Sequence, residues 1–145
     1  MNTKRPILLV EDDSVDAMTV KRSVRDLHLS NPIVHLVNGE DAINFLSQGN
    51  IERPFVILLD LNMPKMTGLE FLKIIKVNEG LKTIPVIVLT TSRERQDVME
   101  SFECGAAGYM IKPVDYAKFT EVINTIIDYW NLSEMPKLVI PVNNE

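Results

Sequence analysis

The sequence predicts a doubly wound α/β domain, in which helices cover both faces of one parallel sheet of five strands. Three observations predict it. Five short apolar segments recur along the 145 residues, amphipathic helical patterns separate them, and the length is that of one ordinary domain. Regular alternation of strand and helix favours right-handed crossovers, which place helices on both sides of the sheet. We therefore expect three layers, α/β/α, with the strand order 2-1-3-4-5.

The five apolar segments are predicted to be strands because they are rich in β-branched residues and lack the strict alternation of a half-exposed sheet. They span residues 7–10, 33–37, 55–59, 86–89 and 109–111. This pattern predicts strands that are buried on both faces.

The first three helices are predicted from apolar residues that recur on one face. Ser14 is the expected cap of the first helix, while the third begins near Gly68 and is ended by Gly80. The residues expected to face the core are, helix by helix, Ala17, Val20, Val24 and Leu27, then Ala42, Phe45 and Leu46, then Leu72 and Ile75.

Two further helices complete the pattern. The fourth is expected to bury Val98 and Phe102. The fifth shows an uninterrupted i, i+3, i+4, i+7 stripe of Phe119, Val122, Ile123, Ile126, Ile127 and Trp130. The pattern ends there, so we expect one domain over residues 1–130 and a C-terminal extension over 131–145, as a tail or one extended segment, with no separate output domain.

Composition excludes several classes of function. Lysine and arginine total 15 against 20 acidic residues, a net charge of −5, which argues against a non-specific nucleic-acid binder. Cys104 is the only cysteine, so no intrachain disulfide or cysteine-based zinc site is expected. No segment approaches the roughly 18 apolar residues that span a bilayer. We expect a cytoplasmic protein that binds neither nucleic acid nor membrane, with structural roles for His28 and His35.

Polar residues follow four of the predicted strands at their carboxyl ends: Glu11 and Asp12, then Asp60, Thr90 and Lys112. In open α/β sheets, ligands bind beyond these ends. Because strands one and three are neighbours in the predicted order, the three carboxylates should converge. Their mutual repulsion requires protons or a cation, and Mg²⁺ prefers such oxygen ligands.

The same cluster suggests phosphoryl chemistry. With a metal ion to polarise an electrophilic phosphorus, Asp60 can act as a nucleophile, while Lys112 and Thr90 supply partners for the phosphoryl oxygens. Each residue alone has a simpler explanation: Asp13 or Ser14 as a helix cap, Asp60 as a turn residue, and the lysine and threonine as solvated side chains. The conjunction at four strand ends favours a site.

Four segments carry these residues in a fixed order. They are Ile-Leu-Leu-Val-Glu-Asp-Asp ending at residue 13, Leu-Leu-Asp-Leu-Asn-Met-Pro-Lys-Met-Thr-Gly ending at 68, Val-Leu-Thr-Thr-Ser ending at 92, and Gly-Ala-Ala-Gly-Tyr-Met-Ile-Lys-Pro ending at 113. Together they resemble the receiver domain of two-component response regulators, over residues 5–130. This family has a flavodoxin-like fold.

The resemblance implies that Asp60 is the phosphoacceptor and that Mg²⁺ is the cofactor. The implied metal ligands are Glu11, Asp12, Asp60 and the backbone carbonyl of Asn62. Glu11 stands where many members of the family have aspartate, a change that keeps the charge and lengthens the side chain.

The resemblance also implies roles on the fourth and fifth strands. Thr90 and Lys112 would contact the phosphoryl group, and Thr90 and Tyr109 would form the switch that responds to it. Pro113 would follow a cis peptide bond, an isomer that only X–Pro bonds adopt at low cost.

For the whole chain, the resemblance implies a single-domain response regulator rather than an enzyme, apart from self-assisted phosphotransfer and dephosphorylation. A sensor histidine kinase or a histidine phosphotransfer protein would be the donor. The output would be a downstream protein target, reached through the face of helix four, strand five and helix five, or onward phosphotransfer. The same face is a candidate homodimer surface, with the tail contributing.

A narrower similarity concerns three other segments. Leu-Lys-Thr-Ile-Pro-Val-Ile-Val-Leu-Thr-Thr-Ser over 81–92, Lys-Pro-Val-Asp-Tyr over 112–116 and Ile-Asp-Tyr-Trp over 127–130 are similar to small stand-alone regulators associated with bacterial and cyanobacterial phytochrome kinases. A phytochrome-type kinase is therefore an implied partner.

Two alternatives come from other classes. An enzyme of the haloacid dehalogenase type also forms an aspartyl phosphate with magnesium, but it requires a second aspartate two residues after the nucleophile, where this chain has Asn62. A flavin-binding module of the same fold requires a Gly/Ser/Thr-rich phosphate loop after strand one, where this chain has three acids that repel phosphate.

Overall fold

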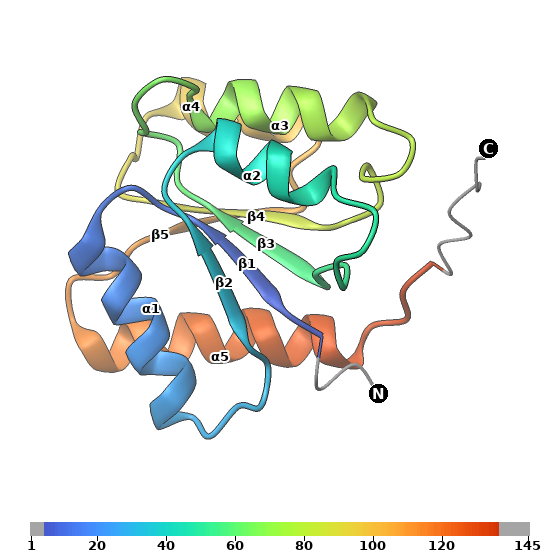
Figure 1. Cartoon of the computed structure of the whole chain (residues 1–145). Coiled ribbons are helices and arrows are strands. Elements are labelled where there is room, and N and C mark those ends of the chain that lie inside the picture. Colours follow the sequence, from blue (N-terminus) through green and yellow to red (C-terminus); the bar gives the residue numbers. More distant parts are fainter. Residues whose placement is uncertain (1–4, 137–145) are drawn as a thin grey trace.

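The computed structural model describes residues 5–136, in which strands and helices alternate from β1 to α5 (Figure 1). The strands are β1 (Ile7–Val10), β2 (Ile33–Leu36), β3 (Val56–Leu59), β4 (Val86–Thr90) and β5 (Gly108–Ile111). The helices are α1 (Ser14–Asp26), α2 (Gly39–Leu46), α3 (Gly68–Val77), α4 (Arg95–Glu103) and α5 (Tyr116–Leu132). The predicted segments are all present, and their ends differ from prediction by a few residues at most.

The strands form one parallel sheet in the order β2-β1-β3-β4-β5, as predicted. In the pairing register, Val10 of β1 lies opposite Leu36 of β2 and Leu59 of β3. The residues that follow Val10 and Leu59, Glu11 and Asp60, therefore leave the sheet at the same level. This register brings acidic residues of distant sequence position to one edge.

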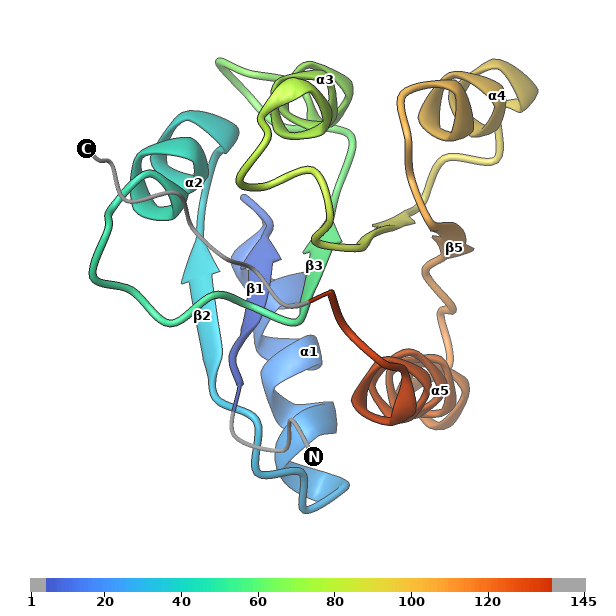
Figure 2. The ribbon, with the colours of Figure 1, turned by 90° about the vertical axis from the view of Figure 1, so that its right-hand side faces the viewer.

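Helices cover both faces of the sheet, with α1 and α5 on one side and α2, α3 and α4 on the other (Figure 2). Successive strand residues point to opposite faces. Leu8 and Val10 of β1 accordingly join the core beneath α2 and α3, whereas Ile7 and Leu9 join the core beside α1 and α5. The predicted three-layer α/β/α architecture is confirmed.

Burial on both faces holds for the central strands only. Every residue of β1, β3 and β4 is buried, but β2 and β5 are half-buried throughout. The prediction is wrong for these two because they are the edge strands, where one side of the backbone has no neighbouring strand. An apolar run alone does not distinguish a central strand from an edge strand.

The helix starts are fixed by side-chain caps. The Asp13 carboxylate accepts hydrogen bonds from the backbone N–H groups of Val15 (2.9 Å) and Asp16 (3.0 Å), so Asp13, rather than Ser14, caps α1. Thr67 and Glu70 form a reciprocal capping box at α3. These caps satisfy backbone donors that have no partner inside the helix, and they fix where α1 and α3 leave the strand ends.

Two helix details differ from prediction. Helix α3 ends at Val77 with Asn78 as its C-cap, before Gly80. In α4 the buried residue is Ser101, whereas Phe102 is 49% exposed. Helix α4 lies beside the edge strand β5 (Figure 2), so it has less of the sheet to cover than α3 has.

The C-terminal boundary is also shifted. Residues 131 and 132 belong to α5 rather than to an extension. Residues 137–145, which make up most of the expected extension, lie outside the described residues. Among helices of residues 5–136, none has the length and apolar character needed to cross a membrane.

Gly68 is required by the close approach of α3 to the end of β3. A Cβ at this position would lie 2.5 Å from the Asp60 carbonyl oxygen and 2.7 Å from Leu61 Cα. We expect Gly68→Ala to lower the free energy of unfolding by about 1–3 kcal/mol because the backbone must shift. Urea unfolding followed by circular dichroism measures this.

Gly49→Ala is the matched control, since a Cβ at Gly49 meets nothing within 4 Å. This variant should stay within about 0.5 kcal/mol of the parent. Equal losses in the two variants would contradict the steric account of Gly68.

Candidate functional site

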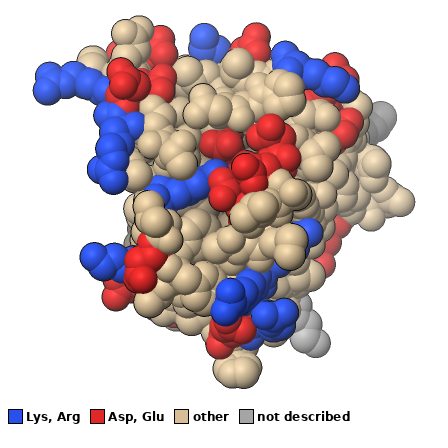
Figure 3. All heavy atoms as spheres, turned by 90° about the vertical axis from the view of Figure 1, so that its left-hand side faces the viewer, with Lys and Arg blue, Asp and Glu red and all other residues tan. Residues whose placement is uncertain are grey.

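Three carboxylates meet at the carboxyl edge of the sheet. Glu11 and Asp12 follow β1, Asp60 follows β3, and one oxygen from each lies within 4.8 Å of the others. Figure 3 faces this edge and shows acidic side chains gathered in a hollow with a basic side chain beside them. The hollow has a volume of about 610 Å³ and is open to solvent. The convergence predicted from strand order is confirmed.

The three acids differ in burial. Glu11 is 2% exposed and Asp60 7%, whereas Asp12 is exposed. Burial raises the pKa of Glu11 to about 7, and the nearby charge of Asp60 adds to this effect, while the hydrogen bond from Lys112 opposes it. A group of carboxylate oxygens with this much unbalanced negative charge is a donor set that suits a hard divalent cation. The cluster can therefore bind a divalent metal.

Lys112, the residue that follows β5, extends its side chain to the same cluster. Its Nζ lies 2.8 Å from Glu11 Oε1, 2.7 Å from Asp16 Oδ2 and 3.8 Å from Asp60 Oδ2. Its side chain is only 7% exposed. Burial opposes the charge, but the hydrogen bonds to Asp16 and Glu11 outweigh it and raise the pKa of Lys112. The lysine is thus a fully charged partner of the acids, as expected from its place in the sequence.

The other predicted site residues differ in burial. Thr90 is fully buried, and the neighbouring Thr91 lines the acidic hollow. Asn62 lies exposed at the same hollow. Tyr109 is half-buried, and its hydroxyl donates to the backbone carbonyl of Ser92 at 2.9 Å. This bond ties β5 to the loop that follows β4.

Sequence reasoning missed one residue that supports the cluster, Asp16. Asp16 binds Lys112 from the first turn of α1. Its position in the first turn of the helix that follows β1 is the sequence signal that could have identified it. His35 Nε2 lies 2.8 Å from the backbone carbonyl oxygen of Glu11, which agrees with the structural role expected for this histidine and also braces the end of β1.

The cis peptide bond expected before Pro113 is not found. Residues 5–136 contain no cis peptide bond, so this expectation is wrong. The trans form is the favoured isomer of an X–Pro bond by about 0.5–1 kcal/mol.

Comparison with protein families gives a match over most of the chain. The model of the response regulator receiver domain matches residues 7–124. This range includes all five strands and the three clustered carboxylates.

Two curated relatives illustrate the similarity. The chain is 38% identical over 133 residues to response regulator Rcp1 of Synechocystis sp., a match that covers 89% of this chain and 90% of that protein. It is 32% identical over 128 residues to chemotaxis protein CheY-3 of Vibrio cholerae, covering 88% of this chain and 95% of that one.

Solved structures give the same result. The phosphorylated cyanobacterial phytochrome response regulator RcpA superposes with a TM-score of 0.85 at 30% identity, covering 92% of this chain and 99% of that chain. The Mn²⁺-bound form of response regulator Rcp1 superposes with a TM-score of 0.82 at 37% identity, covering 91% and 99%. Neither the dehalogenase nor the flavin-binding alternative is consistent with these matches. The chain belongs to the response regulator receiver domain family.

Proposed function

We propose that this response regulator accepts a phosphoryl group on Asp60 from a sensor histidine kinase or a histidine phosphotransfer protein. The observation that carries the proposal is the placement of the Asp60 carboxylate within 4.8 Å of oxygens from Glu11 and Asp12 and 3.8 Å from the ammonium of Lys112. Acidic groups and one ammonium thus both lie near the Asp60 carboxylate. The phosphorylated state of the similar RcpA supports the same chemistry.

In the proposed transfer, a carboxylate oxygen of Asp60 attacks the phosphorus of a phosphohistidine. A P–O bond to Asp60 forms as the P–N bond breaks, and the histidine nitrogen keeps the electron pair of that bond. Lys112 offers a charged donor to the new phosphoryl oxygens. Hydrolysis then returns Asp60 to a free carboxylate, so the chain is a substrate of the transfer rather than an enzyme with its own turnover.

The proposed cofactor is Mg²⁺, held by Glu11, Asp12, Asp60 and the backbone carbonyl of Asn62. When bound, a divalent ion neutralises and polarises the transferring group. Glu11 and Asp12 would hold the ion beside Asp60, and the exposed residues Asp12 and Asn62 line the same hollow as Asp60. The Mn²⁺-bound form of Rcp1 supports a divalent cation in a similar chain.

We propose that the output is a change on the face formed by α4, β5 and α5. A downstream protein or a second copy of this chain would bind the changed face. Alternatively, the phosphoryl group itself would be passed on to another protein. Thr90 would move toward the phosphoryl group, and Tyr109 would follow it, breaking the bond to Ser92 that now ties β5 to the loop before α4.

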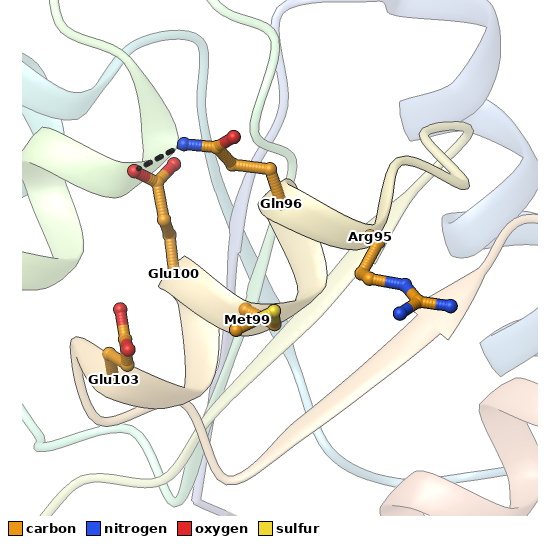
Figure 4. Close-up of a pocket in the computed structure, with 5 residues that line it drawn as sticks. All are labelled: Arg95, Gln96, Met99, Glu100 and Glu103. Carbon is orange, nitrogen blue, oxygen red and sulfur yellow. Dashed lines mark hydrogen bonds between the residues drawn. The ribbon is translucent and has the colours of Figure 1, made fainter.

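Helix α4 offers a surface on which such a change can be read (Figure 4). Its hollow of about 460 Å³ is lined by Arg95, Gln96, Met99, Glu100 and Glu103. Met99 is 55% exposed, so an apolar group is accessible among charged ones. The kinase is proposed to be of phytochrome type, as the similarity to the phytochrome response regulator RcpA suggests, and to meet this chain in the cytoplasm.

Phosphorylation by a small-molecule donor tests the proposal without knowledge of the kinase. Incubation with acetyl phosphate and Mg²⁺ should add the mass of one phosphoryl group to the intact protein, and Asp60→Asn should remove the addition because it removes the nucleophile. Asp128→Asn, which changes an exposed acid on α5, is the matched control and should be modified like the parent. An unmodified parent, or equal modification of Asp60→Asn, would exclude the proposed acceptor.

Stability without metal should fall as the pH rises. Burial raises the pKa of Glu11 from 4.5 to about 7, so the folded chain retains a proton that the unfolded chain has lost. The stability that this retained proton contributes is fully present below pH 4.5 and is lost as the pH rises through about 7. Thermal unfolding in EDTA measures this trend.

Mg²⁺ should restore the stability that is lost at high pH, because the ion would balance the negative charge of the cluster in place of the proton. The increase in melting temperature caused by Mg²⁺ should therefore be larger at about pH 8 than at about pH 5.5. Glu11→Gln should flatten the pH dependence measured in EDTA. A variant with the slope of the parent would rule out Glu11 as the titrating group.

A further inference from the structure

The shortest contact of Lys112 is to a residue outside the carboxylate cluster. Its Nζ lies 2.7 Å from Asp16 Oδ2, compared with 2.8 Å to Glu11 Oε1 and 3.8 Å to Asp60 Oδ2. Asp16 belongs to α1, and Lys112 follows β5. No part of the proposed phosphoryl transfer assigns a task to Asp16.

The position of Lys112 matters because the ammonium and a divalent ion compete for the same oxygens. Glu11 and Asp60 are proposed metal ligands, and both face Lys112. The ammonium already binds Glu11 at 2.8 Å but lies 3.8 Å from Asp60 Oδ2. An ammonium that moved into hydrogen-bond distance of Asp60 would neutralise that carboxylate and occupy the space of the ion. A third acid that binds the ammonium from outside the cluster limits this competition.

Asp16 has the geometry for this task. Its backbone N–H is fixed by the Asp13 carboxylate at 3.0 Å, so the first turn of α1 sets where its side chain starts. Asp16 and Lys112 both line the acidic hollow and also an adjacent hollow of about 400 Å³ that includes Pro113 and Phe119. The pair thus lies between the two hollows, at the rim of the acidic one.

We infer that Asp16 is a positioning residue, whose carboxylate holds the Lys112 ammonium away from Asp60 and so leaves the Asp60 oxygens available to a divalent cation. The inference rests on the proposed function, because it concerns the same cation site. It assigns to Asp16 an effect that acts through Lys112 and requires no contact between Asp16 and the ion.

The test compares Asp16→Asn with Asp13→Asn, using Mn²⁺ alone as the probe and isothermal titration calorimetry of the full chain as the measurement. Both variants remove one negative charge beside the same hollow, and asparagine at position 13 preserves the helix cap. We expect the Mn²⁺ dissociation constant of Asp16→Asn to rise at least about fivefold more than that of Asp13→Asn. Asp16→Glu, which can still bind Lys112, should restore most of the affinity.

A double-mutant cycle with Lys112→Met separates positioning from simple loss of charge. Without the ammonium, Asp16→Asn should weaken Mn²⁺ binding no more than Asp13→Asn does. A second cycle, on urea unfolding in EDTA, should show coupling between Asp16 and Lys112 in metal-free protein. This second readout does not depend on metal binding.

The outcomes distinguish this inference from the proposed function. Equal effects of Asp16→Asn and Asp13→Asn, or an excess effect of Asp16→Asn that persists without Lys112, would overturn the role of Asp16 while leaving the cation site intact. A parent chain that neither binds Mn²⁺ nor accepts a phosphoryl group would overturn both.

Discussion

Repulsion among carboxylates at the end of the sheet is the constraint on which the rest of this edge depends. Glu11 and Asp60 are almost fully buried, so water screens their charges only weakly, and Asp12 adds a third charge at the surface. Lys112 supplies one positive charge. Burial and the charge of Asp60 raise the pKa of Glu11, while the hydrogen bond from Lys112 opposes this. Three carboxylates facing one lysine form a donor set that suits a divalent cation.

The backbone forces these charges together. The register of β1 and β3 aligns Val10 with Leu59, so the next residues must leave the sheet side by side. The close approach of Gly68 to the Asp60 carbonyl brings α3 against this point, and His35 contacts the Glu11 carbonyl from β2. The backbone positions that carry these acids therefore cannot move apart without disturbing the sheet.

Features that follow from strand order could be predicted from the sequence. Glu11, Asp12, Asp60 and Lys112 were predicted to converge because parallel strands end at one edge, and they do. The part played by Asp16 was not predicted, since it depends on the direction in which the first turn of a helix leaves its strand.

Other misses have similar local causes. Phe102 fits an apolar helical stripe, but α4 lies at an edge strand and leaves it exposed. Asp13 caps α1 although Ser14 has comparable capping chemistry. The hydrogen bonds of the cap depend on the position at which the chain enters the helix after β1. The roles of Thr90, Tyr109 and the Asn62 carbonyl stay predictions.

The bond between Asp16 and Lys112 joins residues that are 96 positions apart, and the bond between Glu11 and Lys112 joins residues 101 apart. On the ribosome, the acids emerge well before their lysine, because synthesis proceeds from the N-terminus. The final ordering of this edge is therefore a late event in the maturation of the nascent chain, completed when β5 takes its place.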